Sequence, residues 1–237
     1  MPISRDIIDR TLQSRQGERA VQVTEILQKA GFDTWWVGGG VRDMLRGQLP
    51  KDIDIATSAL PEDVIALFPK CDEIGKQFGS IVVSHKGATF EVTTFREDDE
   101  ASDGRHPESV RFGKRDADAT RRDFTINAIY WNPVDGALFD PCHGEQDLQE
   151  RLIRFIGDPE TRIRHDALRM LRAIRFRALI DGQYHPETFQ ALRSLAGGTA
   201  ELSGVRIATE MEKMLLGPHP ERALEDLWET EILHATI

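Results

Sequence analysis

The chain has 237 residues, of which 40% are apolar, and a formal net charge of −10. The apolar content suffices for one large domain or two small ones, and the negative charge argues against a nonspecific nucleic-acid coat. No apolar run is long enough to span a membrane, the N-terminus does not resemble a signal peptide, and the two cysteines lack metal or disulfide spacing, so we expect a cytoplasmic protein.

The first part of the chain combines helical and strand patterns. Apolar spacing and turn residues predict helices over 18–30, 41–46 and 61–68, with Ser58 as the cap of the third helix. Strands are expected over 34–37, 51–56, 80–85, 89–96 and 110–112. A polar loop is expected over 97–108, and 122–131 has helical spacing at its start.

From about residue 145 the pattern becomes helical, and helices are expected over 146–151, 159–180, 186–196, 205–216 and 220–233. The turn residues at 157–159, Gly-Asp-Pro, are the best candidate for a boundary by composition. The sequence therefore predicts an α+β fold, in which a mixed sheet with flanking helices is followed by an all-helical region.

The most informative motif is a glycine-rich turn followed by Asp52 and Asp54. In a strand, residues i and i+2 point to the same face, so the two carboxylates should project side by side while Ile53 and Ile55 are buried on the other face. Adjacent carboxylates repel unless a cation lies between them, and oxygen ligands combined with substrate phosphates suit Mg²⁺. The alternative is a solvated strand edge.

The turn itself, Gly38-Gly39-Gly40, offers backbone N–H groups to a phosphate, although glycine runs are more often simple turns. Arg42 lies one helical turn further on and could bind a phosphate through two hydrogen bonds. Glu91, on the strand expected over 89–96, is either a third metal ligand or an ordinary exposed glutamate. Together these residues predict phosphoryl or nucleotidyl transfer.

A second motif is the run RRDFTINA over 121–128. Phe124 and Ala128 lie at helical spacing and are expected in the core. The polar residues of the motif would then be available to hold phosphate, ribose and the local fold: Arg122, Asp123 and Asn127. A solvated helix start is the alternative.

Charge is unevenly distributed along the second half of the chain. Residues 151–177 contain eight arginines and three acids, whereas 201–237 contain eight acids and three bases, which indicates a local polyanion site. Four residues recur every three positions and predict a curved stripe on one helix, beside the apolar stripe of Leu168, Leu171 and Ile174: Asp166, Arg169, Arg172 and Arg175. A surface helix with one ion pair is the alternative, but the scarcity of acids favours a row that faces an anion.

Taken in order, these motifs resemble those of class II tRNA nucleotidyltransferases (CCA-adding enzymes) and bacterial poly(A) polymerases, in the DNA polymerase β-like superfamily. The matching runs are GGGVRD with DID, RRDFTINA, Asp140-Pro141 with Gly144 and Asp147-Leu148, and DALRMLRAIRF. The resemblance implies a catalytic head over 1–145 and a helical, nucleotide-reading neck over 146–237. The body and tail domains that hold tRNA in this family are absent from this sequence.

The resemblance also implies roles for single residues. Asp52 and Asp54 would bind Mg²⁺ and would form the catalytic set with Glu91. The nucleotide would be held by the glycine turn, the second motif and the arginine stripe: Gly38, Gly39, Arg42, Arg122, Asp123, Asn127, Asp166, Arg169, Arg172 and Arg175. Asp accepts and Arg donates hydrogen bonds, so Asp166 with Arg169 would suit the amino group and ring acceptor of cytosine or adenine and would reject guanine and uracil.

The implied function is template-independent addition of C and A to tRNA 3′ ends from CTP and ATP. The loop over 97–108, with Asp-Gly-Arg at 103–105, and the segment 75–81 favour the CCA-adding type. The alternatives are an A-adding or poly(A)-adding polymerase, or a nucleotide-binding core with little turnover. The family usually has Glu immediately before the residue that matches Asp166, where this chain has His165, so we expect looser selection between CTP and ATP.

Overall fold

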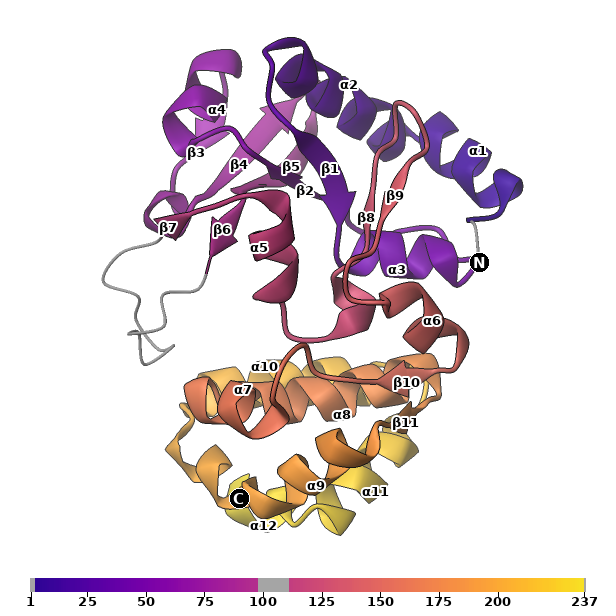
Figure 1. Ribbon diagram of the computed structural model, residues 1–237, viewed down its shortest axis with the longest axis vertical. Coiled ribbons are helices and arrows are strands. Elements are labelled where there is room, and N and C mark those ends of the chain that lie inside the picture. The colour runs from indigo at the N-terminus through magenta and orange to yellow at the C-terminus, as the bar shows by residue number, and fades with distance from the viewer. Residues whose placement is uncertain (1–2, 98–110, 237) are drawn as a thin grey trace. The chain divides into compact units, whose positions relative to one another are not determined.

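The computed structural model describes residues 3–97 and 111–236 and separates into two compact units (Figure 1). Of the described residues, the first unit contains those up to 122 together with 126–145, and the second contains 123–125 and 146–236. The boundary expected at 157–159 is wrong, because this turn lies inside the second unit, where Asp158 caps a helix by accepting the N–H of Thr161.

A seven-stranded mixed sheet forms the centre of the first unit, in the order β3-β4-β5-β2-β1-β8-β9. Its strands are β1 (Thr34–Val37), β2 (Asp54–Thr57), β3 (Cys71–Asp72), β4 (Ser80–His85), β5 (Ala88–Thr94), β8 (Tyr130–Trp131) and β9 (Leu138–Phe139). Neighbouring strands are antiparallel except for β2 and β5, which are parallel. A separate antiparallel pair, β6 (Arg96–Glu97) and β7 (Arg111–Phe112), flanks the part of the expected loop that lies outside the described residues.

The helices of the first unit are α1 (Arg5–Gln13), α2 (Arg15–Lys29), α3 (Gly39–Leu45), α4 (Pro61–Leu67) and α5 (Arg115–Thr120), and α6 (Gly144–Gln149) starts at its end. Serine side chains begin the first two: Ser4 accepts the N–H of Ile7, and Ser14 accepts that of Gly17. The sequence analysis expected α2 and did not anticipate α1.

Ser58 does not cap α4 as expected. Its hydroxyl instead accepts the N–H of Asp33 (2.9 Å). This bond joins the residue before β1 to the residue after β2. The carboxylate of Asp63 accepts the N–H of Leu60 (3.0 Å) and begins the helix in its place.

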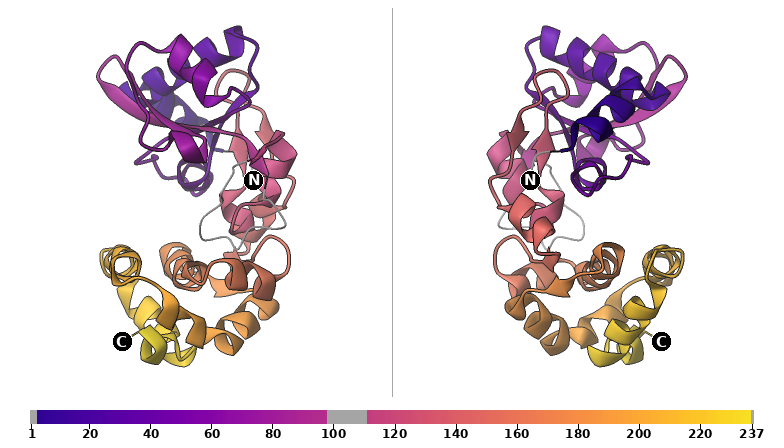
Figure 2. Two further views of the ribbon diagram at one scale, coloured as in Figure 1. Left: turned by 90° about the vertical axis from the view of Figure 1, so that its left-hand side faces the viewer. Right: turned by 90° about the vertical axis from the view of Figure 1, so that its right-hand side faces the viewer.

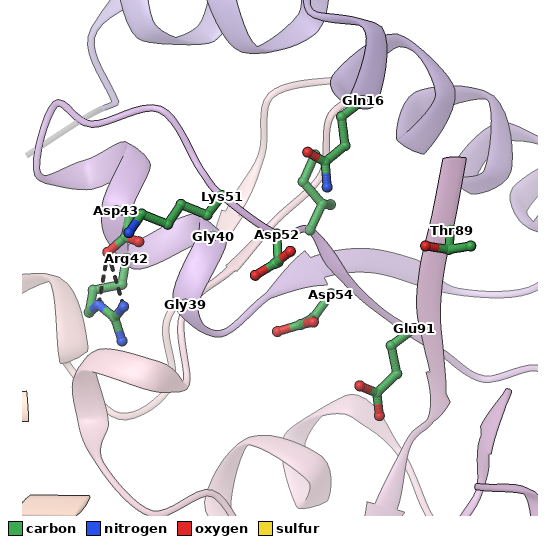
Figure 3. Close-up of a pocket in the computed structure, with 11 residues that line it drawn as sticks. Gln16, Gly39, Gly40, Arg42, Asp43, Lys51, Asp52, Asp54, Thr89 and Glu91 are labelled. Atoms are coloured by element: carbon green, nitrogen blue, oxygen red, sulfur yellow. Dashed lines mark hydrogen bonds and ion pairs between the residues drawn. The ribbon is translucent and has the colours of Figure 1, made fainter. Parts of the chain in front are cut away.

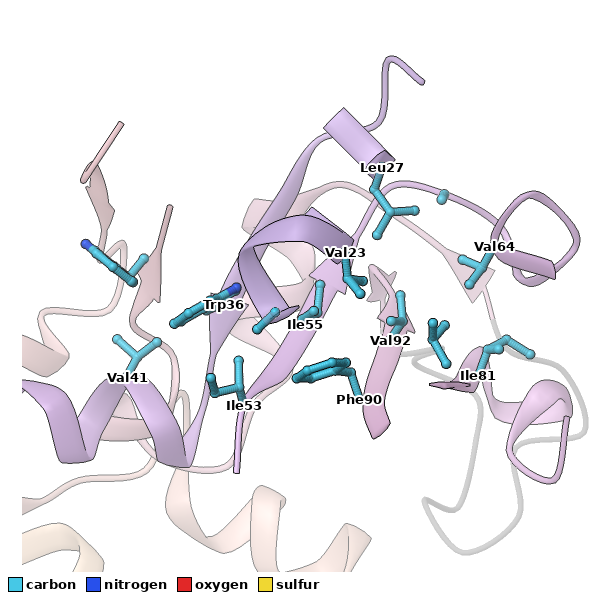
Figure 4. Close-up of a cluster of buried hydrophobic side chains, with 14 of the residues drawn as sticks. Val23, Leu27, Trp36, Val41, Ile53, Ile55, Val64, Ile81, Phe90 and Val92 are labelled. Carbon is cyan, nitrogen blue, oxygen red and sulfur yellow. The ribbon is translucent and has the colours of Figure 1, made fainter. Parts of the chain in front are cut away.

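The main core lies between this sheet and the helices α1 to α4 (Figure 4). Val23 and Leu27 of α2 belong to the same core as Trp36 on β1, whose indole N–H donates to the hydroxyl of Thr24 (3.0 Å). Ile55 belongs to this core, whereas Ala56 belongs to a second cluster with Tyr130. The sheet is therefore buried on both faces, and the site lies where β2 begins.

The second unit is built mainly of helices (Figure 2). They are α7 (Pro159–His165), α8 (Leu168–Ile180), α9 (Pro186–Ser194), α10 (Gly204–Leu215), α11 (Pro220–Glu229) and α12 (Ile232–Thr236), with a short 3₁₀ helix at Ala196–Glu201. A parallel pair, β10 (Leu152–Ile153) and β11 (Gln183–Tyr184), corrects the all-helical expectation.

Two of the long expected helices are interrupted. The helix expected over 159–180 breaks at Asp166, which has extended backbone angles (φ −155°, ψ 104°), and that over 220–233 breaks at Glu231, with φ 62°. The α+β fold class is nevertheless confirmed. None of the helices in the described ranges combines the length and apolar character that crossing a membrane requires.

Candidate functional site

Asp52 and Asp54 line a pocket of about 440 Å³ in the first unit, together with Glu91 (Figure 3). The strand expected over 51–56 is wrong at its start, because β2 begins only at Asp54 and Asp52 lies in the irregular segment before it. The two carboxylates nevertheless project into the same space, from a strand end and from the bend that leads into it.

Glu91 reaches this pocket from β5. The parallel ladder starts with Ile55 opposite Val92, so Asp54 and Glu91 are the residues just before it on the two strands. Glu91 accepts a hydrogen bond from the hydroxyl of Ser80 (2.8 Å). Sequence reasoning left the role of Glu91 open, and the structure places it beside Asp54.

Burial raises the pKa of Asp54, Glu91 and Asp52 add to this effect, and Arg122 and Arg42 oppose it. The pocket thus contains carboxylates whose mutual repulsion a cation would relieve. Within the described ranges no three acidic, histidine or cysteine side chains form a metal-binding group. The neighbouring carboxylates of Asp52 and Asp54 fit a divalent cation that takes further ligands from a substrate's phosphates.

The glycine turn approaches both aspartates closely. Gly38 has φ 74° and ψ −138°, a conformation essentially restricted to glycine, and a Cβ there would lie 3.3 Å from Oδ2 of Asp54. A Cβ on Gly40 would lie 2.7 Å from the carbonyl oxygen of Asp52. The absence of side chains allows this turn to lie against the carboxylates.

Arg42 and Asn127 are brought together in the first unit. Arg42 lines the pocket but is only 5% exposed. Its Nε and Nη2 donate to Oδ1 of Asp43 (3.1 and 3.0 Å), and its Nη1 donates to Oδ1 of Asn127 (2.8 Å). These bonds fix the side chain beneath the glycine turn, so both residues support the turn's position whether or not they also contact a nucleotide.

Asp118 on α5 was missed by the sequence analysis. It is 1% exposed and binds both arginines of the second motif, with Nη2 of Arg121 at 2.7 Å and Nη2 of Arg122 at 3.0 Å. The hydroxyl of Tyr130 (2.6 Å) and the N–H of Arg96 (3.1 Å) also donate to it. An acid three and four residues before two arginines is the helical pairing pattern that could have revealed it.

Charge controls the ionisation of this cluster. Burial would raise the pKa of Asp118, but Arg122, Arg121 and the hydrogen bonds from Tyr130 and Arg96 outweigh it and lower the pKa to about 2. Asp118 is therefore ionised at neutral pH and holds Arg122, whose charge also acts on Asp54.

Residues 123–125 belong to the second unit. Asp123 accepts hydrogen bonds from Nε (2.7 Å) and Nη2 of Arg172. Phe124 is fully buried, with its ring 4.7 Å from that of Phe155, and Ala128 is fully buried in the first unit. The expected core positions are confirmed, whereas the expected helix is reduced to a 3₁₀ turn at Thr125–Asn127.

The expected stripe from Asp166 is broken by the end of α7. Asp166 accepts the N–H of Leu168 (3.1 Å) and two hydrogen bonds from Nη2 of Arg206 on α10 (2.9 and 2.8 Å). Arg169 donates to the carbonyl oxygen of Arg162 (2.7 Å). Arg206 was not singled out from the sequence, and the structure shows that it binds the carboxylate of Asp166.

The arginine-rich segment is largely paired within the protein. Arg175 binds Glu210 on α10 (2.6 Å), and Arg177 lies 3.5 Å from Asp226 on α11. Within the described residues, carboxylate partners are found for the arginines at 151, 154, 164, 172, 175 and 177. Two of the partners, Glu210 and Asp226, come from the acidic segment, so the charge gradient along the sequence does not by itself establish a polyanion site.

Comparison with known proteins identifies the family. The family profile of the poly A polymerase head domain matches residues 34–154, and that of the probable RNA and SrmB-binding site of polymerase A matches 183–237. The chain therefore belongs to the poly A polymerase family. The resemblance to class II tRNA nucleotidyltransferases and bacterial poly(A) polymerases is confirmed.

Individual relatives agree with this assignment. The chain is 46% identical to the CCA-adding enzyme of Geobacillus stearothermophilus over 214 residues, which are 90% of this chain and 53% of that protein. It is similar to the crystal structure of the Bacillus stearothermophilus CCA-adding enzyme in complex with CTP, with TM-score 0.85, 42% identity and coverage of 93% and 53% of the two chains. The Thermotoga maritima CCA-adding enzyme complexed with tRNA_CCA gives TM-score 0.79, 25% identity and coverage of 99% and 55%. The chain thus spans about half the length of the curated relatives it matches.

Proposed function

We propose that this chain adds C and A to the 3′ end of tRNA from CTP and ATP, without a nucleic-acid template and in the cytoplasm. The observation that carries the proposal is the pocket in which Asp52, Asp54 and Glu91 meet the glycine turn. Membership of the family and the similarity to CCA-adding enzymes support the choice of reaction.

In this proposal the 3′-hydroxyl of the tRNA attacks the α-phosphate of the nucleotide in line, and pyrophosphate leaves. Asp52 and Asp54 would hold Mg²⁺, which when bound lowers the pKa of an attacking hydroxyl and neutralises charge on the leaving group. The N–H groups of Gly38 and Gly39 would bind the triphosphate. Arg122 adds positive charge beside Asp54, held there by Asp118.

Residues of the second unit would select the base. We propose that Asp166 and Arg169 contact it, with Arg206 fixing the carboxylate of Asp166. An acceptor and a donor in this arrangement suit cytosine and adenine, and leave buried partners unpaired with guanine or uracil. Arg172 and Arg175 support this region through Asp123 and Glu210.

Asp54→Ala tests the metal assignment. It should abolish incorporation while the far-ultraviolet circular dichroism is unchanged, because the carboxylate carries charge and does not pack in the core. Glu25→Ala, which removes an exposed carboxylate from α2, is the control and should retain activity. Incorporation by Asp54→Ala at the parent's rate would show that the assignment is wrong.

The primer preference tests the reaction itself. Extension with labelled CTP and ATP is compared on tRNA lacking CCA, on tRNA lacking only the terminal A, and on oligo(A). Addition of C and then A to the first primer supports the proposal. Extension of only the second primer would identify an A-adding enzyme, long products on oligo(A) would identify a poly(A) polymerase, and nucleotide binding with no pyrophosphate release would identify a core with little turnover.

A further inference from the structure

Three cations gather beside the catalytic pocket of the first unit: Arg15 and Arg19 on α2, and Lys86 in the turn between β4 and β5. Both arginines reach over the other residue of that turn, Gly87. The position of a Cβ on Gly87 would lie 3.5 Å from Nη2 of Arg15 and 4.0 Å from Nη1 of Arg19. The turn has positive φ at both residues, 47° at Lys86 and 77° at Gly87, so a bare backbone faces the two guanidinium groups.

These cations differ from their neighbours because, within the described ranges, none of the three forms an ion pair. At the other end of α2, Lys29 binds Glu25 (2.9 Å), and on α1 Arg10 lies 3.4 Å from Asp6. Nη1 of Arg19 is inaccessible to solvent and has no hydrogen-bond partner within the described structure.

Within the described residues, three positive charges without an ion pair lie near one another here, although the chain carries a net charge of −10. Glu18, the acid next to Arg19 in the sequence, accepts a hydrogen bond from Gln22 (3.4 Å) instead of pairing with either arginine. Burial lowers the pKa of His85, and the charges of Lys86 and Arg19 lower it further. A polyanion that the net charge of the chain repels would find positive charge at this place.

The group of cations adjoins the catalytic pocket directly. Gln16, the residue after Arg15, and Thr89, two residues after Gly87, both line the pocket that contains Asp52 and Asp54 (Figure 3). A chain leaving the carboxylates past Gln16 and Thr89 would therefore meet the three cations next. The glycine turn and Arg42 line another part of the same pocket.

We propose that Arg15, Arg19 and Lys86 bind backbone phosphates of the RNA strand whose 3′ end enters the catalytic pocket. The inference rests on the proposed function, which requires an RNA 3′-hydroxyl at the carboxylates while the nucleotide occupies the glycine turn. Backbone phosphates carry one charge per nucleotide, and unpaired arginine and lysine side chains bind them without regard to sequence. The bare backbone of Gly87 leaves room for the two guanidinium groups to lie together over the turn.

The experiment compares Arg15→Gln/Lys86→Gln with a Lys29→Gln control, which removes a paired cation from the same helix. Binding of tRNA lacking CCA is measured by fluorescence anisotropy at several salt concentrations, and KM is measured separately for tRNA and for CTP. The double variant should weaken tRNA binding about tenfold and reduce the salt dependence by one to two phosphate contacts. The KM for CTP should be unchanged, and the control should match the parent. Arg19→Gln, tested alone, should act in the same direction.

Two results would overturn the proposal: tRNA affinity and salt dependence equal to those of the parent, or an effect on CTP or on pyrophosphate inhibition with none on tRNA. The latter would assign the cations to the triphosphate. Both exchanged residues of the double variant are exposed, so an unchanged melting temperature is expected and is checked. If the parent binds tRNA but incorporates nothing, the proposed function fails while the binding comparison still decides this inference; if the parent binds no tRNA, both fail.

Discussion

Nη2 of Arg206 lies 2.9 and 2.8 Å from the two carboxylate oxygens of Asp166, which is 40 residues earlier in the chain. Asp166 also accepts the N–H of Leu168, so its orientation is fixed by one contact within its own motif and one from α10. The residue before it is His165. In this chain the aspartate that we propose reads the base is held by a cation on another helix.

We therefore expect Arg206→Gln to reduce discrimination between CTP or ATP and the other nucleotides. The side chain of Arg206 is 42% exposed, and such pairs contribute at most about 1 kcal/mol, so selectivity should fall about fivefold. The ratio of kcat/KM values for CTP and UTP measures it. Arg222→Gln removes a pair of similar exposure with Asp181 and should leave that ratio unchanged. An unchanged ratio in Arg206→Gln would remove Arg206 from base selection.

Asp118→Asn should destabilise the first unit strongly at neutral pH. It leaves Arg121 and Arg122 without the carboxylate that binds both of them, and breaking such buried pairs costs about 3–5 kcal/mol. Because the pKa of Asp118 is lowered from 3.8 to about 2, its contribution is fully present above about pH 4 and is lost as the pH falls towards 2.

Urea unfolding of the parent and of Asp118→Asn is measured between pH 7 and pH 3. The difference between their free energies of unfolding should be constant from pH 7 to about pH 5 and should become smaller below pH 4. Asp116→Asn, which changes an exposed acid on the same helix, is the control. A gap that stays constant down to pH 3 would contradict the lowered pKa.

Asp54→Asn should raise stability when divalent cations are absent. Burial, Glu91 and Asp52 raise the pKa of Asp54, so its ionised form is unfavourable in the fold at pH 7, and this cost disappears as the pH falls through the raised pKa. Removing the charge should therefore raise the Tm measured in EDTA.

The effect of Mg²⁺ on Tm is the second measurement of this test. A cation that binds the folded state raises its stability, so Mg²⁺ should raise the Tm of the parent and have little effect on Asp54→Asn. Differential scanning calorimetry measures the Tm of both proteins in EDTA and in Mg²⁺. Equal Mg²⁺ shifts in the two proteins would count against Asp54 as a ligand.

Gly38→Ala and Gly47→Ala form a matched pair for the glycine turn. Both glycines have positive φ, 74° and 75°, so both substitutions should cost about 1–3 kcal/mol in backbone strain. Only the Cβ on Gly38 would meet the site, 3.3 Å from Asp54, whereas that on Gly47 has no atom within 4 Å. At a temperature where both variants are folded, Gly38→Ala should lose most of its activity and Gly47→Ala little; equal losses would mean that the turn acts through stability only.

The sequence by itself determined the local features of the site. The run from the glycine turn to Asp54, the strand at 34–37 and the hairpin around residues 86 and 87 follow from short-range rules, because glycine conformations and strand alternation depend on neighbouring residues. Phe124 and the stripe residues Leu171 and Ile174 are fully buried, whereas Leu168, the first residue of the expected apolar stripe, is half-buried. Ordered motifs of this length also sufficed to identify the family.

Only the tertiary structure decided how the charges pair. Counting acids within the arginine-rich segment suggested a row that faces an anion, yet Glu210 and Asp226 arrive from α10 and α11 to bind Arg175 and Arg177. The pair of Arg206 with Asp166 was found only in the structure, since 40 residues separate the two along the chain and an ion pair depends on the distance between side chains. The same reason applies to Arg15, Arg19 and Lys86, because only the folded structure shows that no carboxylate of the described residues forms an ion pair with them.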